Sequence, residues 1–149
     1  MQGLVLYQKI YDFLLYIYPV INQYPRFEKF ALQTQTKNCV LDMLRLTIRA
    51  NKSTTGKVSK LYEVDALLEE LRALFRLAND LSQGQKLPEP MANKQVTESS
   101  QPENKGGKVK RTLYISKRRY EIVSRKLDEI GRLLGGLIKH VQAAQNSRK

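Results

Sequence analysis

The sequence predicts an all-α protein, an antiparallel four-helix bundle with a long flexible insertion between its third and fourth helices. Apolar residues recur at intervals of three and four along four segments, which is the spacing of amphipathic helices. No run alternates between apolar and polar residues, so nothing indicates a strand. The links between the first three segments are short, and short links join antiparallel neighbours in a bundle. We therefore expect a single domain over residues 1–149.

The first helix is expected from Leu4 to Tyr18, with Pro19 and Pro25 bracketing a break after it. Its apolar residues fill an arc of about 200° on a helical wheel. The second helix is expected from Arg26 to Ala50 and carries two apolar stripes on nearly opposite sides. One stripe holds Phe27, Phe30, Leu41, Leu44 and Ile48, and the other holds Leu32, Cys39, Met43, Leu46 and Ala50.

A third helix is expected from Val58 to Leu81, after a turn at residues 51–57. Residues 82–111 then contain three prolines, three glycines and no aromatic residue, so they are predicted to form the flexible insertion. Ser116 is a good N-cap for the last helix, whose apolar face ends near Val141. Residues 142–149 are expected to fray into a basic tail.

One copy of this bundle has more apolar surface than it can bury. The first helix is apolar over more than half of its circumference and the second has two stripes, although a bundle helix needs one apolar face of modest width. We therefore expect the chain to self-associate, with Tyr7, Tyr11, Leu14 and Tyr18 at the interface between copies. The alternatives are a compact monomer with exposed tyrosines, or tyrosines that stack on nucleic-acid bases.

The net charge of +12 is concentrated near the C-terminus, where residues 111–149 hold ten basic and three acidic side chains. On a helix, residues seven apart lie nearly above one another. The last helix therefore carries a cationic ridge on the side roughly opposite its apolar face. The ridge consists of Arg118, Arg125, Arg132 and Lys139, and Lys117 and Arg119 add charge at its start.

Such a ridge can bind a polyanion, and nucleic acid is favoured over a membrane. Two other interpretations remain open. The charge can serve solubility alone, or the cations can form ordinary ion pairs with carboxylates four residues away in the same helix. Those pairs are Glu121 with Arg125 and Asp128 with Arg132.

No catalytic, metal or cofactor site is predicted. Cys39 and His140 are the single cysteine and histidine, which excludes a disulfide within the chain and a cysteine- or histidine-based metal site. No nucleophile has a base patterned near it. No apolar run reaches the length of a membrane span, and the N-terminus lacks the basic region of a secretory signal. We therefore expect a cytoplasmic protein that is not an enzyme.

Three stretches carry a resemblance to a known family. They are YIYPVINQYPRFEKF, NKSTTGKVSKLYEVDALLEELRALFRLANDL and YEIVSRKLDEIGRLLGGLIKH. Together they resemble the accessory variability determinants, small four-helix proteins encoded by bacteria or phages beside diversity-generating retroelements. The combination of LRALFRLA with IGRLLGG is fairly specific, and each half alone would be weak.

The resemblance implies a barrel-shaped homopentamer that is not an enzyme and needs no cofactor. It implies binding to the reverse transcriptase of the retroelement and to its template RNA or complementary DNA, in support of mutagenic retrohoming. Arg72 and Arg76 match the family's basic positions on the third helix, and Arg132 is the arginine of IGRLLGG.

Two departures from the family pattern stand out: Leu137 replaces a usual tryptophan, and residues 82–111 interrupt a junction that is usually direct. The alternative function is that of a related group, the proteins encoded within bacterial ribosomal RNA genes. Such a protein is an RNA-binding or structural bundle with no polymerase partner.

Overall fold

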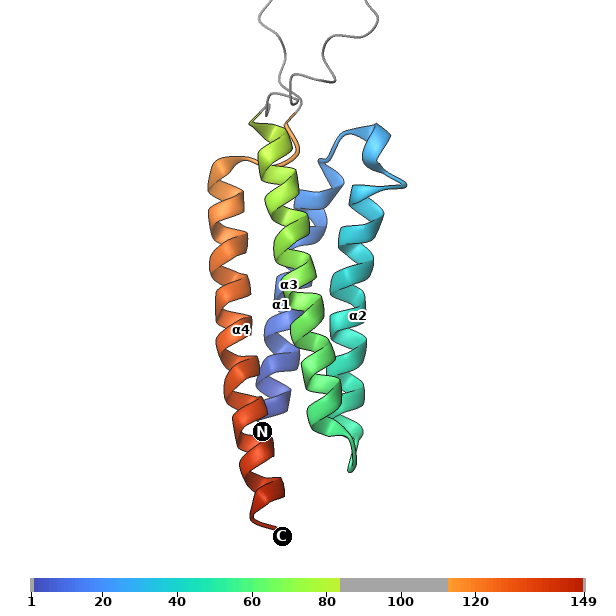
Figure 1. Cartoon of the computed structure of the whole chain (residues 1–149). Coiled ribbons are helices and arrows are strands. Elements are labelled where there is room, and N and C mark those ends of the chain that lie inside the picture. Colours follow the sequence, from blue (N-terminus) through green and yellow to red (C-terminus); the bar gives the residue numbers. More distant parts are fainter. Residues whose placement is uncertain (1, 84–112, 149) are drawn as a thin grey trace, which may run out of the picture.

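A computed structural model of the chain describes residues 2–83 and 113–148, and within them the chain forms an antiparallel bundle of four helices. The helices are α1 (Gln2–Asn22), α2 (Leu32–Lys52), α3 (Lys57–Ser82) and α4 (Lys117–Asn146), with a short 3-10 helix, η1 (Arg26–Glu28), after α1. Each helix packs against two neighbours, so α1, α2, α3 and α4 follow one another around the bundle (Figure 1). The predicted fold class is confirmed, and the predicted insertion lies, beyond Gln83, outside the described residues.

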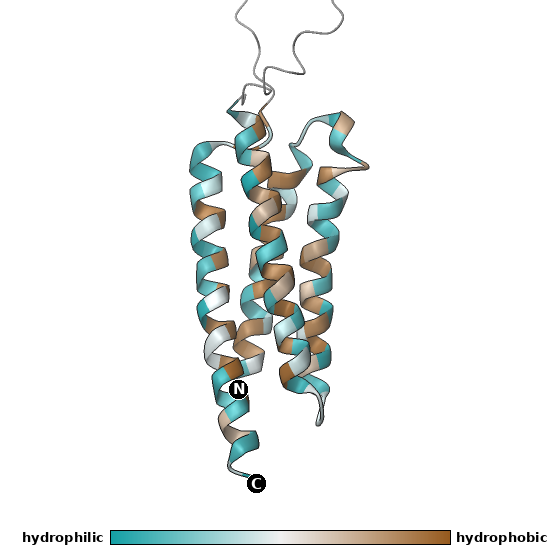
Figure 2. Ribbon diagram, in the orientation of Figure 1, coloured by the Kyte–Doolittle hydropathy of each residue, from teal (hydrophilic) through white to brown (hydrophobic). Residues whose placement is uncertain are grey.

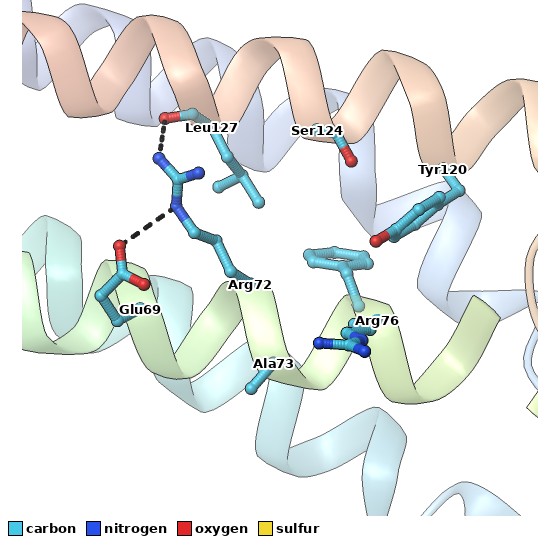
Figure 3. A pocket seen from close by; sticks show the side chains of 8 residues that line it. Glu69, Arg72, Ala73, Arg76, Tyr120, Ser124 and Leu127 are labelled. Carbon is cyan, nitrogen blue, oxygen red and sulfur yellow. Dashed lines mark hydrogen bonds and ion pairs between the residues drawn. The ribbon is translucent and has the colours of Figure 1, made fainter. Parts of the chain in front are cut away.

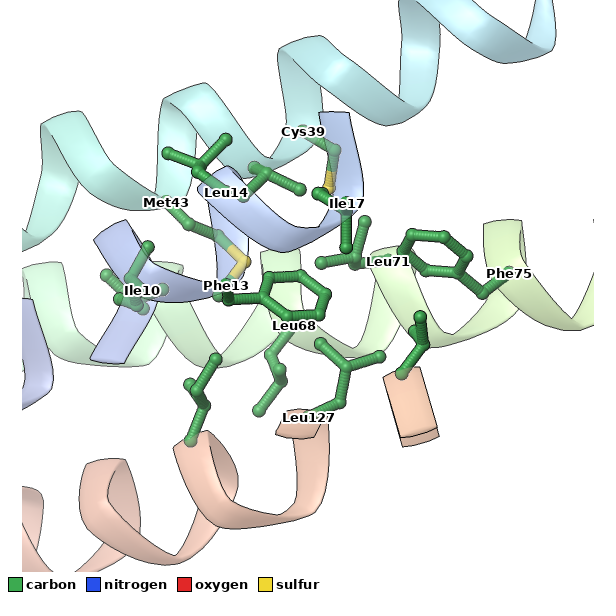
Figure 4. Close-up of a cluster of buried hydrophobic side chains, with 14 of the residues drawn as sticks. Ile10, Phe13, Leu14, Ile17, Cys39, Met43, Leu68, Leu71, Phe75 and Leu127 are labelled. Carbon is green, nitrogen blue, oxygen red and sulfur yellow. The ribbon is translucent and has the colours of Figure 1, made fainter. Parts of the chain in front are cut away.

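The core is built from large side chains that all four helices contribute (Figure 4). Phe13 of α1 meets Phe75 of α3 edge to face, with ring centroids 6.2 Å apart. Met43 of α2 and Leu127 of α4 are buried in the same cluster. Burying one side chain of this size contributes about 1.5–3 kcal/mol, so this cluster is the main source of the bundle's stability.

Helix α1 runs through Pro19 instead of ending before it. A proline inside a helix removes one N–H donor and crowds the carbonyl four residues earlier, which costs about 3 kcal/mol. Beyond the proline, Val20, Ile21 and Tyr24 are buried, and side chains of this kind contribute about 1.5–3 kcal/mol each on burial. The predicted break was wrong because this burial offsets the cost of the proline.

The longer α1 also changes one expectation about membranes. By length and composition alone, Gln2–Asn22 could cross a bilayer, whereas the sequence analysis found no run of that length. In the bundle, eight residues of α1 are buried against the rest of the chain. A core helix of a soluble protein passes the same test, so the helix is weak support for a membrane span.

The second helix begins at Leu32 rather than at Arg26, because residues 26–28 form η1. The Glu28 carboxylate accepts a hydrogen bond from the Leu32 N–H at 3.2 Å, which satisfies a donor at the start of α2. The same carboxylate accepts a hydrogen bond from the Tyr114 hydroxyl at 2.9 Å, which ties this turn to the segment before α4. As a result, Phe27 and Phe30 lie outside α2 and are 70% and 88% exposed. The ribbon coloured by hydropathy shows apolar residues in the connection between α1 and α2 (Figure 2).

The hydroxyl of Ser82 joins the end of α3 to the segment that leads into α4. It accepts hydrogen bonds from the N–H groups of Tyr114 at 2.9 Å and Ile115 at 3.0 Å. It also donates to the carbonyl of Ala78 at 2.8 Å. Ser82 was predicted at the start of the insertion, but it is buried as the last residue of α3.

Helix α4 begins as predicted and ends later. The Ser116 hydroxyl accepts a hydrogen bond from the Arg119 N–H at 3.2 Å, which confirms the predicted N-cap. The helix continues to Asn146 rather than fraying after Val141. The Gln142 side chain donates to the Tyr62 hydroxyl of α3 at 2.9 Å, and this contact holds the last turns against the bundle.

Candidate nucleic-acid interface

The cationic ridge lies on the exposed side of α4. Arg118, Arg125, Arg132 and Lys139 are all exposed, whereas Val123, Leu127, Ile130 and Leu134 of the same helix face the core. At 1.5 Å per residue the ridge extends over roughly 30 Å. Four cations in one row can contact several phosphates of a strand that runs along the helix.

Two of the three acidic residues of α4 are paired with other helices and not with the ridge. Asp128 contacts Arg72 of α3 at 2.7 Å, and Glu129 contacts Lys9 of α1 at 2.8 Å. Within residues 2–83 and 113–148, none of the ridge cations forms an ion pair, so the expected pairs at i,i+4 are not present there. The charge of the ridge is therefore not neutralised by ion pairs within the described residues.

The pair of Lys9 and Glu129 shows how these contacts shift titration. The hydrogen bond from Lys9, and then its charge, lower the pKa of the Glu129 carboxyl, and the charges of Lys126 and Arg132 add to this effect. The same hydrogen bond and charge raise the pKa of Lys9. Both groups are exposed, so we attribute little stability to the pair. The main consequence of the pair is that Lys9, and not a ridge cation, is the ion-pair partner of Glu129.

Arg72 clamps α3 to α4 and is not a free cation (Figure 3). Besides Asp128, its guanidinium pairs with Glu69 at 3.4 Å and donates to the carbonyl of Leu127 at 3.5 Å. Gly131 makes room for it, because a Cβ at that position would lie 3.0 Å from the guanidinium. With two carboxylates around it, Arg72 is better suited to hold the bundle together than to bind a phosphate.

Arg76, one turn further along α3, is the more available of the two helix-3 arginines. Its side chain is 78% exposed, and its contact with Asp80 is long, at 3.8 Å. It lines a groove of about 330 Å³ between α3 and α4 together with Tyr120 and Ser124 (Figure 3). An anion that reaches this groove can therefore meet Arg76.

The three cations at the start of α4 differ in their surroundings. Lys117 and Arg118 are exposed, whereas Arg119 is half-buried and donates to the side-chain oxygen of Gln23. Arg119 thus links α4 to the turn that follows α1. A partner can reach Lys117 and Arg118 directly, but Arg119 would first have to leave Gln23.

The residues predicted at an interface between copies do not share one environment. Leu14 is only 7% exposed and belongs to the core of its own chain, because α1 turns it toward the bundle axis. Tyr7 and Tyr11 stack with ring centroids 6.2 Å apart, and Tyr11 is exposed. Tyr18 is half-buried, with the Lys37 ammonium 5.0 Å from its ring centre. The outer face of α1 therefore includes Tyr7 and Tyr11 but not Leu14.

Sequence reasoning missed contacts that join helices distant in the chain. Lys126 lies 5.1 Å from the ring centre of Tyr16, which adds a cation–π contact between α1 and α4. The Arg72–Asp128 and Lys9–Glu129 pairs also link helices far apart in sequence. A helical wheel gives the face on which a residue lies but not the partner opposite it, so it could not find them.

Cys39 does not have the properties of a nucleophile. It is buried and its thiol donates to the carbonyl of Leu67 at 3.3 Å. Burial, with smaller effects from Glu70 and Asp42, raises its pKa to about 12, so the reactive thiolate is scarce at neutral pH. Among the residues that the structure describes, no group of three potential metal ligands comes together.

The comparison with known families points to one group. A family model described as bAvd-like matches residues 4–109, which is well over half of the chain. The match includes α1, α2 and α3 and ends before α4. No curated protein matches the chain.

Proposed function

The chain belongs to the bAvd-like family, the accessory variability determinants of diversity-generating retroelements, and from this membership we propose what it binds. It is a non-catalytic accessory protein that holds the element's reverse transcriptase together with nucleic acid, either template RNA or complementary DNA. In this role it supports mutagenic retrohoming. If no reverse transcriptase co-purifies with a chain that still binds RNA, the alternative of an RNA-binding bundle without a polymerase partner is favoured.

The observation that carries the nucleic-acid part of the proposal is the unpaired ridge on α4. Of the three carboxylates near it on α4, Asp128 and Glu129 are occupied by Arg72 and Lys9, and Glu121 forms no ion pair with a ridge cation within the described residues. Cations that are not neutralised within the protein release condensed counterions when they contact phosphates, and this release drives binding. The ridge would hold the backbone with little reading of base sequence, because phosphate contacts carry no sequence information.

The second part of the proposal is that copies assemble into a homopentamer. Large apolar side chains remain exposed on α1 and in the connection between α1 and α2, with Leu4 and Leu15 each 63% exposed and Phe30 88% exposed. Exposed apolar surface of this extent favours association with another copy. A ring would also repeat the ridge, so that weak contacts at each copy add up to a useful affinity.

Removing the ridge charges is expected to weaken RNA binding. The variant Arg118→Gln/Arg125→Gln/Arg132→Gln should lose on the order of tenfold to hundredfold in affinity for single-stranded RNA at moderate salt. The slope of log affinity against log salt should fall by about 2, since each phosphate contact contributes about 0.7 for single strands. Fluorescence anisotropy at several salt concentrations measures both quantities, and circular dichroism checks that the helices remain.

A charge-matched control separates the ridge from net charge. The variant Lys29→Gln/Arg45→Gln/Arg49→Gln removes three exposed cations, one just after η1 and two on α2. It should keep most of the wild-type affinity. Equal losses in the two variants would mean that only total charge matters, and an unchanged affinity in the ridge variant would remove the ridge from the interface.

Sedimentation of the purified chain is expected to show particles of five copies at micromolar concentration. The physical reason is the exposed apolar surface on α1 and in the connection between α1 and α2, which one copy leaves unburied. Sedimentation as single chains at that concentration would contradict the pentamer. Phe30→Ala should shift the distribution toward smaller particles, whereas Lys29→Ala at the preceding position should not.

A further inference from the structure

A second basic site lies at the end of the bundle away from η1. A pocket of about 360 Å³ is formed there by the turn between α2 and α3, the first residue of α3 and the last turns of α4. Its polar lining comes from Ser53, Thr54, Lys57, His140, Gln145 and Arg148. Val141 and Ala144 supply apolar wall.

The ionisable side chains that line this pocket are all basic. They are Lys57, His140 and Arg148, and no carboxylate from the residues that the structure describes lines the pocket. In the described part of the chain, neither Lys57 nor Arg148 forms an ion pair, nor does His140. The Ser53 hydroxyl donates to the carbonyl of Arg49 at 2.7 Å. Three basic groups, one at the start of α3, one on α4 and one just after α4, therefore share one cavity, and no described carboxylate in its lining neutralises them.

We propose that this pocket binds a phosphate group, and specifically the terminal phosphate of a nucleic-acid strand. A terminal phosphate carries a charge of about −1.5 to −2 at neutral pH, whereas a phosphate inside a strand carries one negative charge. Several basic groups in one cavity match the higher charge. The position fits as well, because His140 directly follows Lys139, the last cation of the ridge. The strand-end assignment rests on the proposed function, but binding of phosphate itself does not.

The single histidine of the chain reports on this pocket alone. In untagged protein at pH 8, its ring protons give the only imidazole signals in a proton NMR spectrum. Added inorganic phosphate should shift them in a saturable way, and sodium chloride at the same ionic strength should not. The shift should be lost in Lys57→Gln/Arg148→Gln and kept in Lys29→Gln, which removes a cation at the other end of the bundle. If phosphate produces no shift, or the same shift in the double variant, the site is overturned.

The strand-end assignment is tested with three RNA 12-mers of one sequence, carrying a 5′-phosphate, a 3′-phosphate or only terminal hydroxyls. One phosphorylated form should bind roughly three- to tenfold more tightly than the hydroxyl form, as expected for a few partly exposed charge contacts. Lys57→Gln/Arg148→Gln should abolish that difference, whereas the ridge variant should weaken all three strands alike. Equal binding of the three strands by wild-type protein overturns the strand-end assignment. Failure of every strand to bind, with the His140 shift intact, instead counts against the proposed function and leaves the phosphate site standing.

Discussion

Replacing Ser82 with alanine is expected to lower the free energy of unfolding by about 2–4 kcal/mol. The Ser82 hydroxyl accepts hydrogen bonds from the N–H groups of both Tyr114 and Ile115. All three residues are buried, so water cannot readily take its place. Each buried N–H left without a partner costs about 1–3 kcal/mol. For a small domain this is a large share of a total of about 5–15 kcal/mol.

Urea denaturation followed by circular dichroism measures the loss, and Ser59→Ala is the matched control. Ser59 is an exposed serine on the same helix, so its replacement should change the free energy of unfolding by less than about 0.5 kcal/mol. A Ser82→Ala chain as stable as the Ser59→Ala chain would show that the hydroxyl does not hold the junction. The melting temperature should likewise fall more in Ser82→Ala than in Ser59→Ala.

The importance of Ser82 could not have been predicted from composition. It begins a stretch rich in glycine, proline and polar residues, and a local window therefore assigns it to the insertion. Its partners, Tyr114 and Ile115, lie on the far side of that stretch. The periodicity of apolar residues indicates which nearby residues lie on one face of a helix. It does not indicate a hydrogen bond between residues on the two sides of an insertion.

Fold class was predictable because the bundle depends on a repeated pattern. Apolar spacing predicted four helices, and the Ser116 cap predicted where α4 begins. The ends of α1 and α2 were predicted less well. Pro19 stops an isolated helix, but α1 continues because Val20 and Ile21 are buried by other helices. Tertiary burial decided that boundary, and tertiary burial is not a local property.

The surroundings of the candidate interface residues could be predicted only in part, for the same reason. That the ridge cations share a face follows from helical geometry, and the structure shows all of them exposed. The pairing of Arg72 with Asp128 could not be predicted, because the two residues are far apart in sequence and come together only when α3 packs against α4. Leu14 was misplaced for a similar reason: α1 is apolar over so wide an arc that its pattern does not show which edge meets the core.

The second large effect is expected from Phe75→Ala. Phe75 is 1% exposed and packs edge to face on Phe13 at the centre of the bundle. Removing a buried phenylalanine side chain loses its transfer free energy and leaves a cavity, and together these cost about 3–5 kcal/mol. We expect the variant to unfold at a much lower urea concentration than the wild type, at any protein concentration.

Phe30→Ala makes the same chemical change on the surface and is the matched control. Phe30 is 88% exposed, so the isolated chain should lose less than about 0.5 kcal/mol. If copies bury Phe30 against one another, however, its removal should lower stability more at high protein concentration than at low, because association stabilises the folded chain by mass action. The two substitutions therefore separate the core of one copy from the contact between copies. A loss from Phe75→Ala as small as that from Phe30→Ala in dilute protein would contradict the packing of the bundle itself.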